Sequence, residues 1–156
     1  MATCYGSLES KLDSDSLDVL STYLPRSVIL KDGTPCLLDH LDINSNLLSQ
    51  AITLFNDMIR EGLSWPFDNE FSEEEFVSYF CGHAAFWIVD QKEDQKEDEG
   101  GKLVGMYYIK PNFPGRCSKT CNGGFLVHPE YRGKGAAKIM VFTFLIPNFF
   151  VFNFLF

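Results

Sequence analysis

An apolar segment runs directly into a glycine-rich turn and then into a helix-like stretch at VHPEYRGKGAAKIM, residues 127–140. The turn itself reads Arg132, Gly133, Lys134, Gly135. The start of a helix leaves backbone N–H groups without intrahelical partners and carries partial positive charge. Glycines let the main chain approach an anion closely. The segment therefore predicts a strand, a loop and a helix that bind a phosphate or diphosphate, with Arg132 and Lys134 adding charge-assisted contacts.

Two familiar phosphate loops do not fit this turn. A nucleoside triphosphatase loop places Ser or Thr after its lysine, and here Gly135 follows Lys134. A dinucleotide-binding loop has a third glycine where this chain has Lys138. No nearby acidic residue is placed to coordinate magnesium, so no metal is expected.

The rest of the chain predicts a mixed α/β domain around one sheet. Apolar periodicity and turn signals predict, in order, two short strands within 27–40 around Asp32–Gly33, a helix over 46–62 and a helix that begins at the Ser72–Glu75 capping box. Three strands follow, over 84–90, 102–110 and 122–128. The last elements are a helix from about Gly135 to Pro147 and a strand over 149–156. A chain of 156 residues can bury one core. We expect an N-terminal extension over residues 1–25 and one domain over 26–156.

Composition excludes several classes of function. The formal net charge of −8 argues against a broad nucleic-acid-binding surface. No zinc pattern or secretory signal is found, and the cysteines are expected to be free thiols in a reducing compartment: Cys4, Cys36, Cys81, Cys117 and Cys121. The expected location is the cytoplasm, with the nucleus as a further location.

The C-terminal segment over residues 141–156 has no charged residue. It is slightly short for a membrane span, and Pro147, Asn148 and Asn153 interrupt it. We interpret it as the end of a buried helix followed by a core strand, and we expect no membrane association.

The glycine loop also resembles a known motif. Arg132 to Ala137 fits the pattern Arg-x-x-Gly-x-Gly/Ala, and a strand ending in Val127-His-Pro129 precedes it. This resembles motif A of the GNAT acyltransferases, whose loop holds the pyrophosphate of acetyl-CoA. The longer segment YYIKPNFPGRCSKTCNGGFLVHPEYRGKG is similar to the fungal N-acetyltransferases that act on azetidine-2-carboxylate, a proline analogue, and the resemblance covers about residues 103–137. The terminal VFNFLF is similar to the Val-Phe-Asn strand of that family.

The resemblance implies a GNAT-like, mainly antiparallel sheet flanked by helices, and it implies site residues. The diphosphate of acetyl-CoA would bind the amides of Gly133, Gly135, Ala136 and Ala137, with Arg132 and Lys134 in support. The backbone of Phe125, Leu126 and Val127 would pair with the pantetheine arm, and an N–H near Leu126 would polarise the thioester.

Two asparagines would face the acceptor, an amine that attacks the thioester directly. These are Asn122 and Asn153. Asn122 precedes two glycines and can instead serve a turn, and Asn153 can be an amide satisfied at the edge of the core. His83 and His128 have no partner visible in the sequence, and nothing nearby activates Cys121 as a nucleophile.

The chain departs from the family after Ala137. Family members continue with a longer helix, a strand, a helix carrying the tyrosine that protonates the departing thiolate, and closing strands. We therefore expect an incomplete C-terminal part, weak binding of acetyl-CoA and poor catalysis, and leave open a homodimer that supplies the missing strands.

The leading hypothesis is an N-acetyltransferase that moves acetyl from acetyl-CoA to the amine of a small amino or imino acid. One alternative keeps the chemistry and changes the acceptor to a protein terminus or a polyamine. Another is a non-catalytic domain that binds acyl-CoA.

Overall fold

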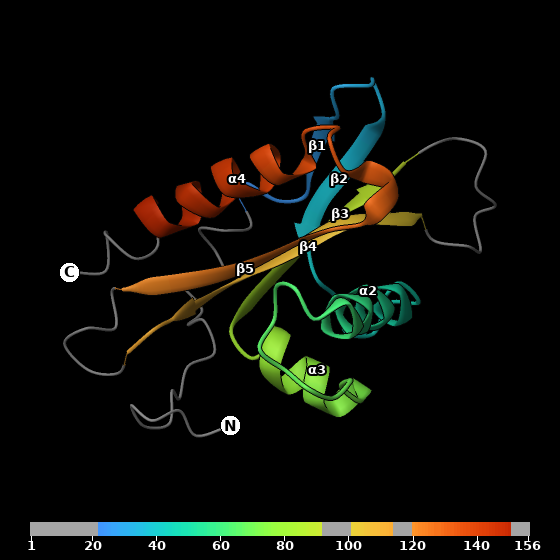
Figure 1. The fold of residues 1–156 in the computed structure, drawn as a ribbon. Coiled ribbons are helices and arrows are strands. Elements are labelled where there is room, and N and C mark those ends of the chain that lie inside the picture. Colours follow the sequence, from blue (N-terminus) through green and yellow to red (C-terminus); the bar gives the residue numbers. More distant parts are fainter. Residues whose placement is uncertain (1–21, 92–100, 114–119, 151–156) are drawn as a thin grey trace.

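The structure is a computed structural model, and it describes residues 22–91, 101–113 and 120–150 (Figure 1). Its strands are β1 (Arg26–Ile29), β2 (Pro35–His40), β3 (Ala84–Asp90), β4 (Lys102–Pro111) and β5 (Cys121–Val127). Its helices are α2 (Leu48–Glu61), α3 (Glu73–Phe80) and α4 (Ala136–Phe150), and a short 3-10 helix, η3 (Pro129–Tyr131), precedes α4. The predicted order of elements is confirmed as far as α4. The N-terminal extension predicted over residues 1–25 lies almost wholly outside the described residues.

The strands form one antiparallel sheet in the order β1-β2-β3-β4-β5. Each strand pairs with the strand before it in the chain, and α2 and α3 are inserted between β2 and β3. The turn predicted at Asp32–Gly33 joins β1 to β2, and Gly33 has a φ of 87°, which favours glycine. Within the described part of the chain, β1 and β5 are the two edges of the sheet.

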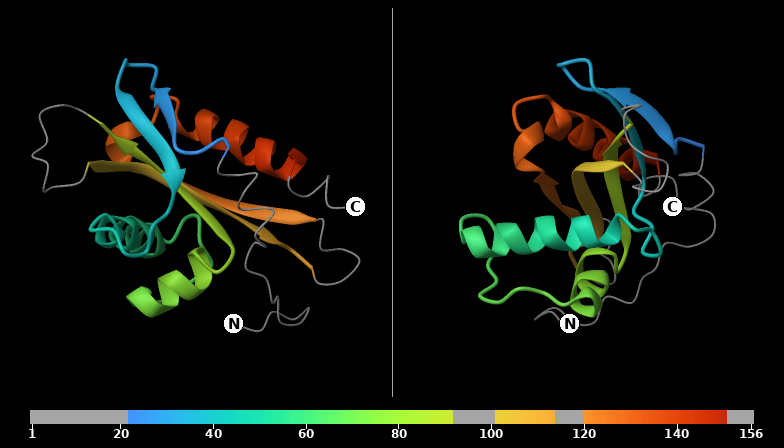
Figure 2. Two further views of the ribbon diagram at one scale, coloured as in Figure 1. Left: turned by 180° about the vertical axis from the view of Figure 1, so that it is seen from behind. Right: turned by 90° about the vertical axis from the view of Figure 1, so that its right-hand side faces the viewer.

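Helices cover both faces of the sheet, α2 and α3 on one and α4 on the other (Figures 1 and 2). Alternation along β3 explains how one strand serves two cores. Ala85 and Trp87 pack with the α2 and α3 side, while Phe86 and Ile88 pack with the α4 side. A strand buried on both faces is expected to be apolar throughout, as the sequence AAFWIV is.

The two helices on the first face begin and end where the sequence predicts. Gly62 ends α2 with a φ of 68°, and its N–H donates to the carbonyls of Met58 and Ile59. Ser72 begins α3 with a complete capping box, because its hydroxyl accepts from the Glu75 N–H and the Glu75 carboxylate accepts from the Ser72 N–H.

A bulge in β4 sets which side chains reach the α2 and α3 side. Ile88 pairs with Gly105 but Val89 pairs with Leu103, so one extra residue stands in β4 between the two pairs. Leu103 and Met106 consequently lie in the same core cluster although they are three residues apart. Because of this bulge, Met106 and every second residue after it, such as Tyr108, lie on the α2 and α3 side.

The predicted end of the last helix is wrong. Pro147 does not stop α4, which continues to Phe150. A proline inside a helix removes one backbone hydrogen bond and crowds the carbonyl four residues before it, but its φ is close to that of a helix, so it weakens or bends the helix without having to end it. Residues 149 and 150 of the predicted last strand are therefore helical, and residues 151–156 lie outside the described residues. Of the helices that the structure describes, none is both long enough and apolar enough to cross a bilayer.

Candidate functional site

The glycine loop lies between η3 and α4 and has the backbone conformation that its glycines predict. Gly133 has a φ of 79° and Gly135 a φ of 93°. A side chain at either position would be strained, because L-residues rarely adopt this region. A Cβ at Gly133 would meet no atom within 4 Å, so the space beside this residue is open.

Several N–H groups of the loop remain available. Arg132 N–H donates to the Pro129 carbonyl and Lys134 N–H donates to the Tyr131 carbonyl. The first bond of α4 runs from Ile139 N–H to the Gly135 carbonyl. Among the described residues, these bonds leave the predicted donors unused: the N–H groups of Gly133, Gly135, Ala136 and Ala137. A cluster of such donors at a helix start is suited to an anion.

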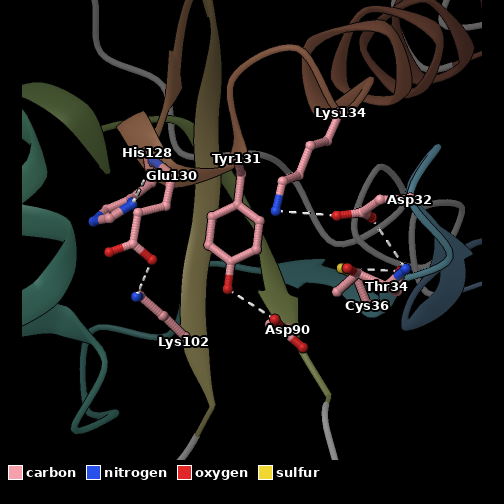
Figure 3. A network of polar contacts seen from close by, with 9 residues as sticks. All are labelled: Asp32, Thr34, Cys36, Asp90, Lys102, His128, Glu130, Tyr131 and Lys134. Atoms are coloured by element: carbon pink, nitrogen blue, oxygen red, sulfur yellow. Dashed lines mark hydrogen bonds and ion pairs between the residues drawn. The ribbon is translucent and has the colours of Figure 1, made fainter.

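Two contacts with the sheet hold the loop in place (Figure 3). The Tyr131 hydroxyl donates to the buried Asp90 carboxylate at 2.8 Å. The exposed Lys102 ammonium pairs with the Glu130 carboxylate. Both partners come from the ends of β3 and β4 that face η3, so the position of the loop depends on the sheet.

We expect Tyr131→Phe to destabilise the fold, because it removes a donor from a buried carboxylate. The expected loss in the free energy of unfolding is about 1–3 kcal/mol, measured by urea denaturation. Tyr107→Phe is the matched control: its hydroxyl donates at 3.1 Å to the neutral Thr143 hydroxyl, and the expected loss is about 0.5–1.5 kcal/mol. A larger loss for Tyr107→Phe would contradict the role given to Asp90.

The β1–β2 loop packs against the glycine loop and changes the surroundings of Lys134. Lys31 N–H donates to the Lys134 carbonyl at 2.9 Å, and a Cβ at Gly135 would lie 3.1 Å from the Lys31 side chain. The Lys134 ammonium pairs with the Asp32 carboxylate at 3.0 Å (Figure 3). Hydrogen bonds from Thr34 and then from Lys134 lower the pKa of Asp32 to about 2. Lys134 therefore has a permanently charged partner at neutral pH.

Arg132 points toward α2, where its Nη2 lies 3.6 Å from the Met58 sulfur. Its side chain is exposed and forms no ion pair with a described residue. Of the two cations predicted beside the loop, Arg132 thus keeps its charge unpaired, whereas Lys134 does not.

The register of β5 decides which backbone groups face its open edge. His128 N–H donates to the Val104 carbonyl at 2.9 Å, which marks a hydrogen-bonded pair of the β4–β5 ladder. Such pairs alternate along an antiparallel ladder, so the N–H and C=O of Leu126 also face β4. Those of Phe125 and Val127 face the other way, toward an edge that no described strand covers.

Polar residues gather at the far end of the β4–β5 pair, on the α2 and α3 side of the sheet. Asn122 Nδ2 donates to Asn112 Oδ1 at 2.8 Å. Asn122 also stands directly opposite Lys110, and side chains of opposite residues share a face. The structure thus brings Asn122 together with Lys110, which sequence reasoning did not single out. The other predicted asparagine, Asn153, lies outside the described residues.

Aromatic rings cover Gly124 beside this polar group. A Cβ at Gly124 would lie 2.5 Å from the Trp65 ring and 2.6 Å from the Tyr108 ring, so only glycine fits there. The Tyr79 and Tyr108 hydroxyls lie 3.3 Å apart. These rings come from the α2–α3 loop, α3 and β4. No local sequence pattern joins such distant segments, which is why sequence reasoning missed them.

The α2–α3 loop is fixed by one buried amide on α2. Asn56 Nδ2 donates to the Phe71 carbonyl at 2.9 Å, and Asn56 Oδ1 accepts from the Phe71 N–H at 2.8 Å. This pair of bonds satisfies both functions of the amide and holds the loop that carries Trp65 against the sheet.

The candidate nucleophile and bases have ordinary structural surroundings. Burial raises the pKa of the Cys121 thiol, which disfavours the reactive thiolate. His128 Nδ1 accepts from the Glu130 N–H at 3.4 Å and so helps to begin η3. Within the described ranges, no three His, Cys, Asp or Glu side chains lie close enough together to hold a metal ion.

A comparison with protein families identifies the family to which the chain belongs. Residues 55–145, more than half of the chain, match the acetyltransferase (GNAT) family. The chain belongs to this family. The match includes β5, the glycine loop and most of α4, so the GNAT resemblance inferred from the sequence is confirmed. This family uses acetyl-CoA.

The GNAT relatives include fungal proteins. N-acetyltransferase aca1 of Schizosaccharomyces pombe is 34% identical over 108 residues, which cover 64% of this chain and 52% of that protein. Protein SPT10 of Saccharomyces cerevisiae is 25% identical over 176 residues, which cover 81% of this chain and 27% of that protein. The chain thus spans about half the length of the first relative and about a quarter of the second.

Solved structures share the GNAT fold. A GCN5-related N-acetyltransferase from Kribbella flavida aligns with a TM-score of 0.58 and 19% identity, over 71% of this chain and 64% of that one. An N-acetyltransferase from Staphylococcus aureus Mu50 aligns with a TM-score of 0.59 and 14% identity, over 72% and 66%. The predicted fold class, a mainly antiparallel sheet flanked by helices, is confirmed.

Proposed function

We propose that this protein transfers the acetyl group of acetyl-CoA to the amine of a small amino or imino acid of the proline-analogue type. The observation that carries the proposal is the pairing of two features. No described residue accepts from the N–H groups of Gly133, Gly135, Ala136 and Ala137, and no described strand covers the outer edge of β5, which leads into them. A diphosphate joined to an extended amide chain, as in coenzyme A, matches an anion site that continues into a strand edge.

The residues fit the coenzyme in a definite order along the chain. The loop amides bind the diphosphate, and Arg132 adds positive charge. The outward N–H and C=O groups of Phe125 and Val127 pair with the amides of the pantetheine arm. In this register the N–H that polarises the thioester carbonyl belongs to one of these two residues, because Leu126 is bonded to β4.

The transfer needs few catalytic side chains once the two substrates are positioned and the thioester carbonyl is polarised. The neutral amine attacks the carbonyl carbon of the thioester, a C–N bond forms, the C–S bond breaks, and coenzyme A leaves as its thiolate. The attacking nitrogen loses one proton, and the coenzyme A thiolate takes up one proton, so the products are the N-acetylated acid and the free thiol. Holding the two reactants side by side supplies much of the rate. We assign to Asn122 Oδ1 the hydrogen bond from the acceptor amine. The bond from Asn122 Nδ2 to Asn112 supports this assignment, because it leaves the oxygen of the same amide for another donor.

The proposed activity is tested by following thiol release from acetyl-CoA with azetidine-2-carboxylate as acceptor. We expect release that depends on the acceptor, and none with N-acetylated azetidine-2-carboxylate, which has no free amine. A parallel screen with spermidine and a short peptide tests the other acceptor classes. Binding of coenzyme A by calorimetry without release for any acceptor would instead identify a non-catalytic acyl-CoA-binding domain.

A further inference from the structure

Lys110 on β4 has unusual surroundings for a lysine. Its ammonium lies over the Tyr79 ring, 3.9 Å from the centroid, and over the Tyr108 ring, 4.5 Å from the centroid. The side chain is half-buried, and burial lowers the pKa of Lys110. Two ring faces attract the positive charge, but they offer no lone pair to the three N–H donors of an ammonium.

The described part of the chain supplies no counter-ion for the Lys110 ammonium. Within residues 22–91, 101–113 and 120–150, no Asp or Glu forms an ion pair with Lys110, and no acceptor is bonded to its ammonium. The contrast with Lys102 and Lys134 is direct, because each of these has a carboxylate partner. A half-buried cation without a counter-ion gains from any anion that reaches it.

The position of Lys110 links it to the proposed reaction. Its side chain turns back along β4 to the Tyr108 ring, and that ring covers Gly124. The next residue, Phe125, directs its backbone to the open edge where the thioester is proposed to lie. The Tyr108 ring thus lies between the ammonium, 4.5 Å from its centroid, and Gly124, the residue just before that edge position.

We propose that Lys110 binds the carboxylate of the acceptor and so selects amines that carry a neighbouring carboxylate. This inference rests on the proposed acetyl transfer to a small amine. In an α-amino or α-imino acid a single carbon separates the nitrogen from the carboxylate carbon, so a carboxylate bound by Lys110 keeps the amine near Asn122, the residue opposite Lys110 on the same face. A polyamine places a second cation beside Lys110, and the resulting repulsion disfavours it.

The test compares an acid with its ester in the wild type and in Lys110→Met. With azetidine-2-carboxylate, we expect kcat/KM to fall by about tenfold to a hundredfold, the loss typical of one charge-assisted hydrogen bond. With the methyl ester of the same acid, and for the KM of acetyl-CoA, we expect little change. The ratio of acid to ester is the readout, because differences in amine basicity cancel between the two proteins.

Two further variants complete the design. Arg26→Met removes one positive charge from the exposed β1, at the opposite edge of the sheet, and we expect it to keep the wild-type ratio. Lys110→Arg keeps the charge and is expected to retain most of the preference for the acid. Equal losses for acid and ester in folded Lys110→Met, judged by circular dichroism, would overturn the proposal and leave Lys110 as a packing residue of the tyrosine pair.

A binding measurement separates this inference from the proposed function. Saturation-transfer NMR reports binding of azetidine-2-carboxylate and of azetidine, which lacks the carboxylate, to protein mixed with coenzyme A. Binding of the acid alone, lost in Lys110→Met, supports the inference even when no turnover occurs. If the wild type acetylates azetidine-2-carboxylate and its methyl ester equally well, the inference is overturned while the proposed acetyl transfer stands. This comparison uses the wild type alone, so it does not depend on the folding of a variant.

Discussion

Gly133→Leu is expected to weaken the binding of coenzyme A by at least about tenfold, which corresponds to 1.4 kcal/mol. The reason is steric. Gly133 has a φ of 79° and open space where its Cβ would project, beside the unused N–H groups of the loop. A leucine side chain would occupy the space in which we propose that the diphosphate binds. Isothermal titration calorimetry with coenzyme A measures the change directly.

The chain offers a closely matched control for this substitution. Gly62, at the end of α2, has a φ of 68° and likewise nothing within 4 Å of a built Cβ. Gly62→Leu and Gly133→Leu should therefore lose similar stability, about 1–2 kcal/mol, from the left-handed backbone alone. We expect Gly62→Leu to bind coenzyme A as the wild type does. Equal affinity of the two folded variants would rule out the glycine loop as the diphosphate site.

Local signals in the sequence predict the elements around this loop well. The Ser72–Glu75 capping box, the Gly62 helix end and the Asp32–Gly33 turn each depend on residues within a few positions of one another. Hydrogen bonds and backbone preferences of that range depend on residues close together in the chain, so a local pattern is enough to predict them. The glycine loop belongs to the same class, which is why its conformation follows from its residues.

Contacts between distant segments could not be predicted in the same way. Lys134 was expected to face an anion, and its ammonium pairs with Asp32 from the β1–β2 loop. The sequence predicts a polarising N–H near Leu126 but not which residue supplies it. The ladder with β4 directs the N–H of Leu126 inward and those of Phe125 and Val127 outward. Both outcomes depend on strand register and loop packing, which a single sequence does not encode in any short pattern.

The acceptor side of the site shows the same limit most clearly. Lys110 stands in a run of apolar strand residues, and the role that we propose for it depends on α3, which brings Tyr79 against its ammonium. Trp65 reaches Gly124 because Asn56 fixes the α2–α3 loop. The aromatic residues between positions 65 and 80 are numerous in the sequence, but nothing in their spacing shows that Tyr79 lies over a lysine of β4.

Among these substitutions, we expect the largest loss of stability from one in the aromatic cluster between α2 and α3. Phe55→Ala is expected to lower the free energy of unfolding by about 3–5 kcal/mol, because the ring is fully buried and its removal leaves a cavity. The phenyl ring of Phe55 is surrounded by six aromatic side chains, whose ring centroids lie 5.1–6.4 Å from its own: Trp65, Phe67, Phe71, Phe76, Tyr79 and Phe80. Urea denaturation followed by tryptophan fluorescence measures the loss.

Phe142→Ala is the control for this change, because it removes the same ring from α4, where the side chain is 56% exposed. Its expected cost is within about 0.5 kcal/mol. If Phe55→Ala unfolds completely, Phe55→Leu supplies a milder step in the same direction. Since Phe55 supports Trp65 and Tyr79, a folded Phe55 variant should also raise the KM for the acceptor while the KM for acetyl-CoA stays near its wild-type value. Similar costs for Phe55→Ala and Phe142→Ala would show that this cluster does not hold the acceptor side of the fold together.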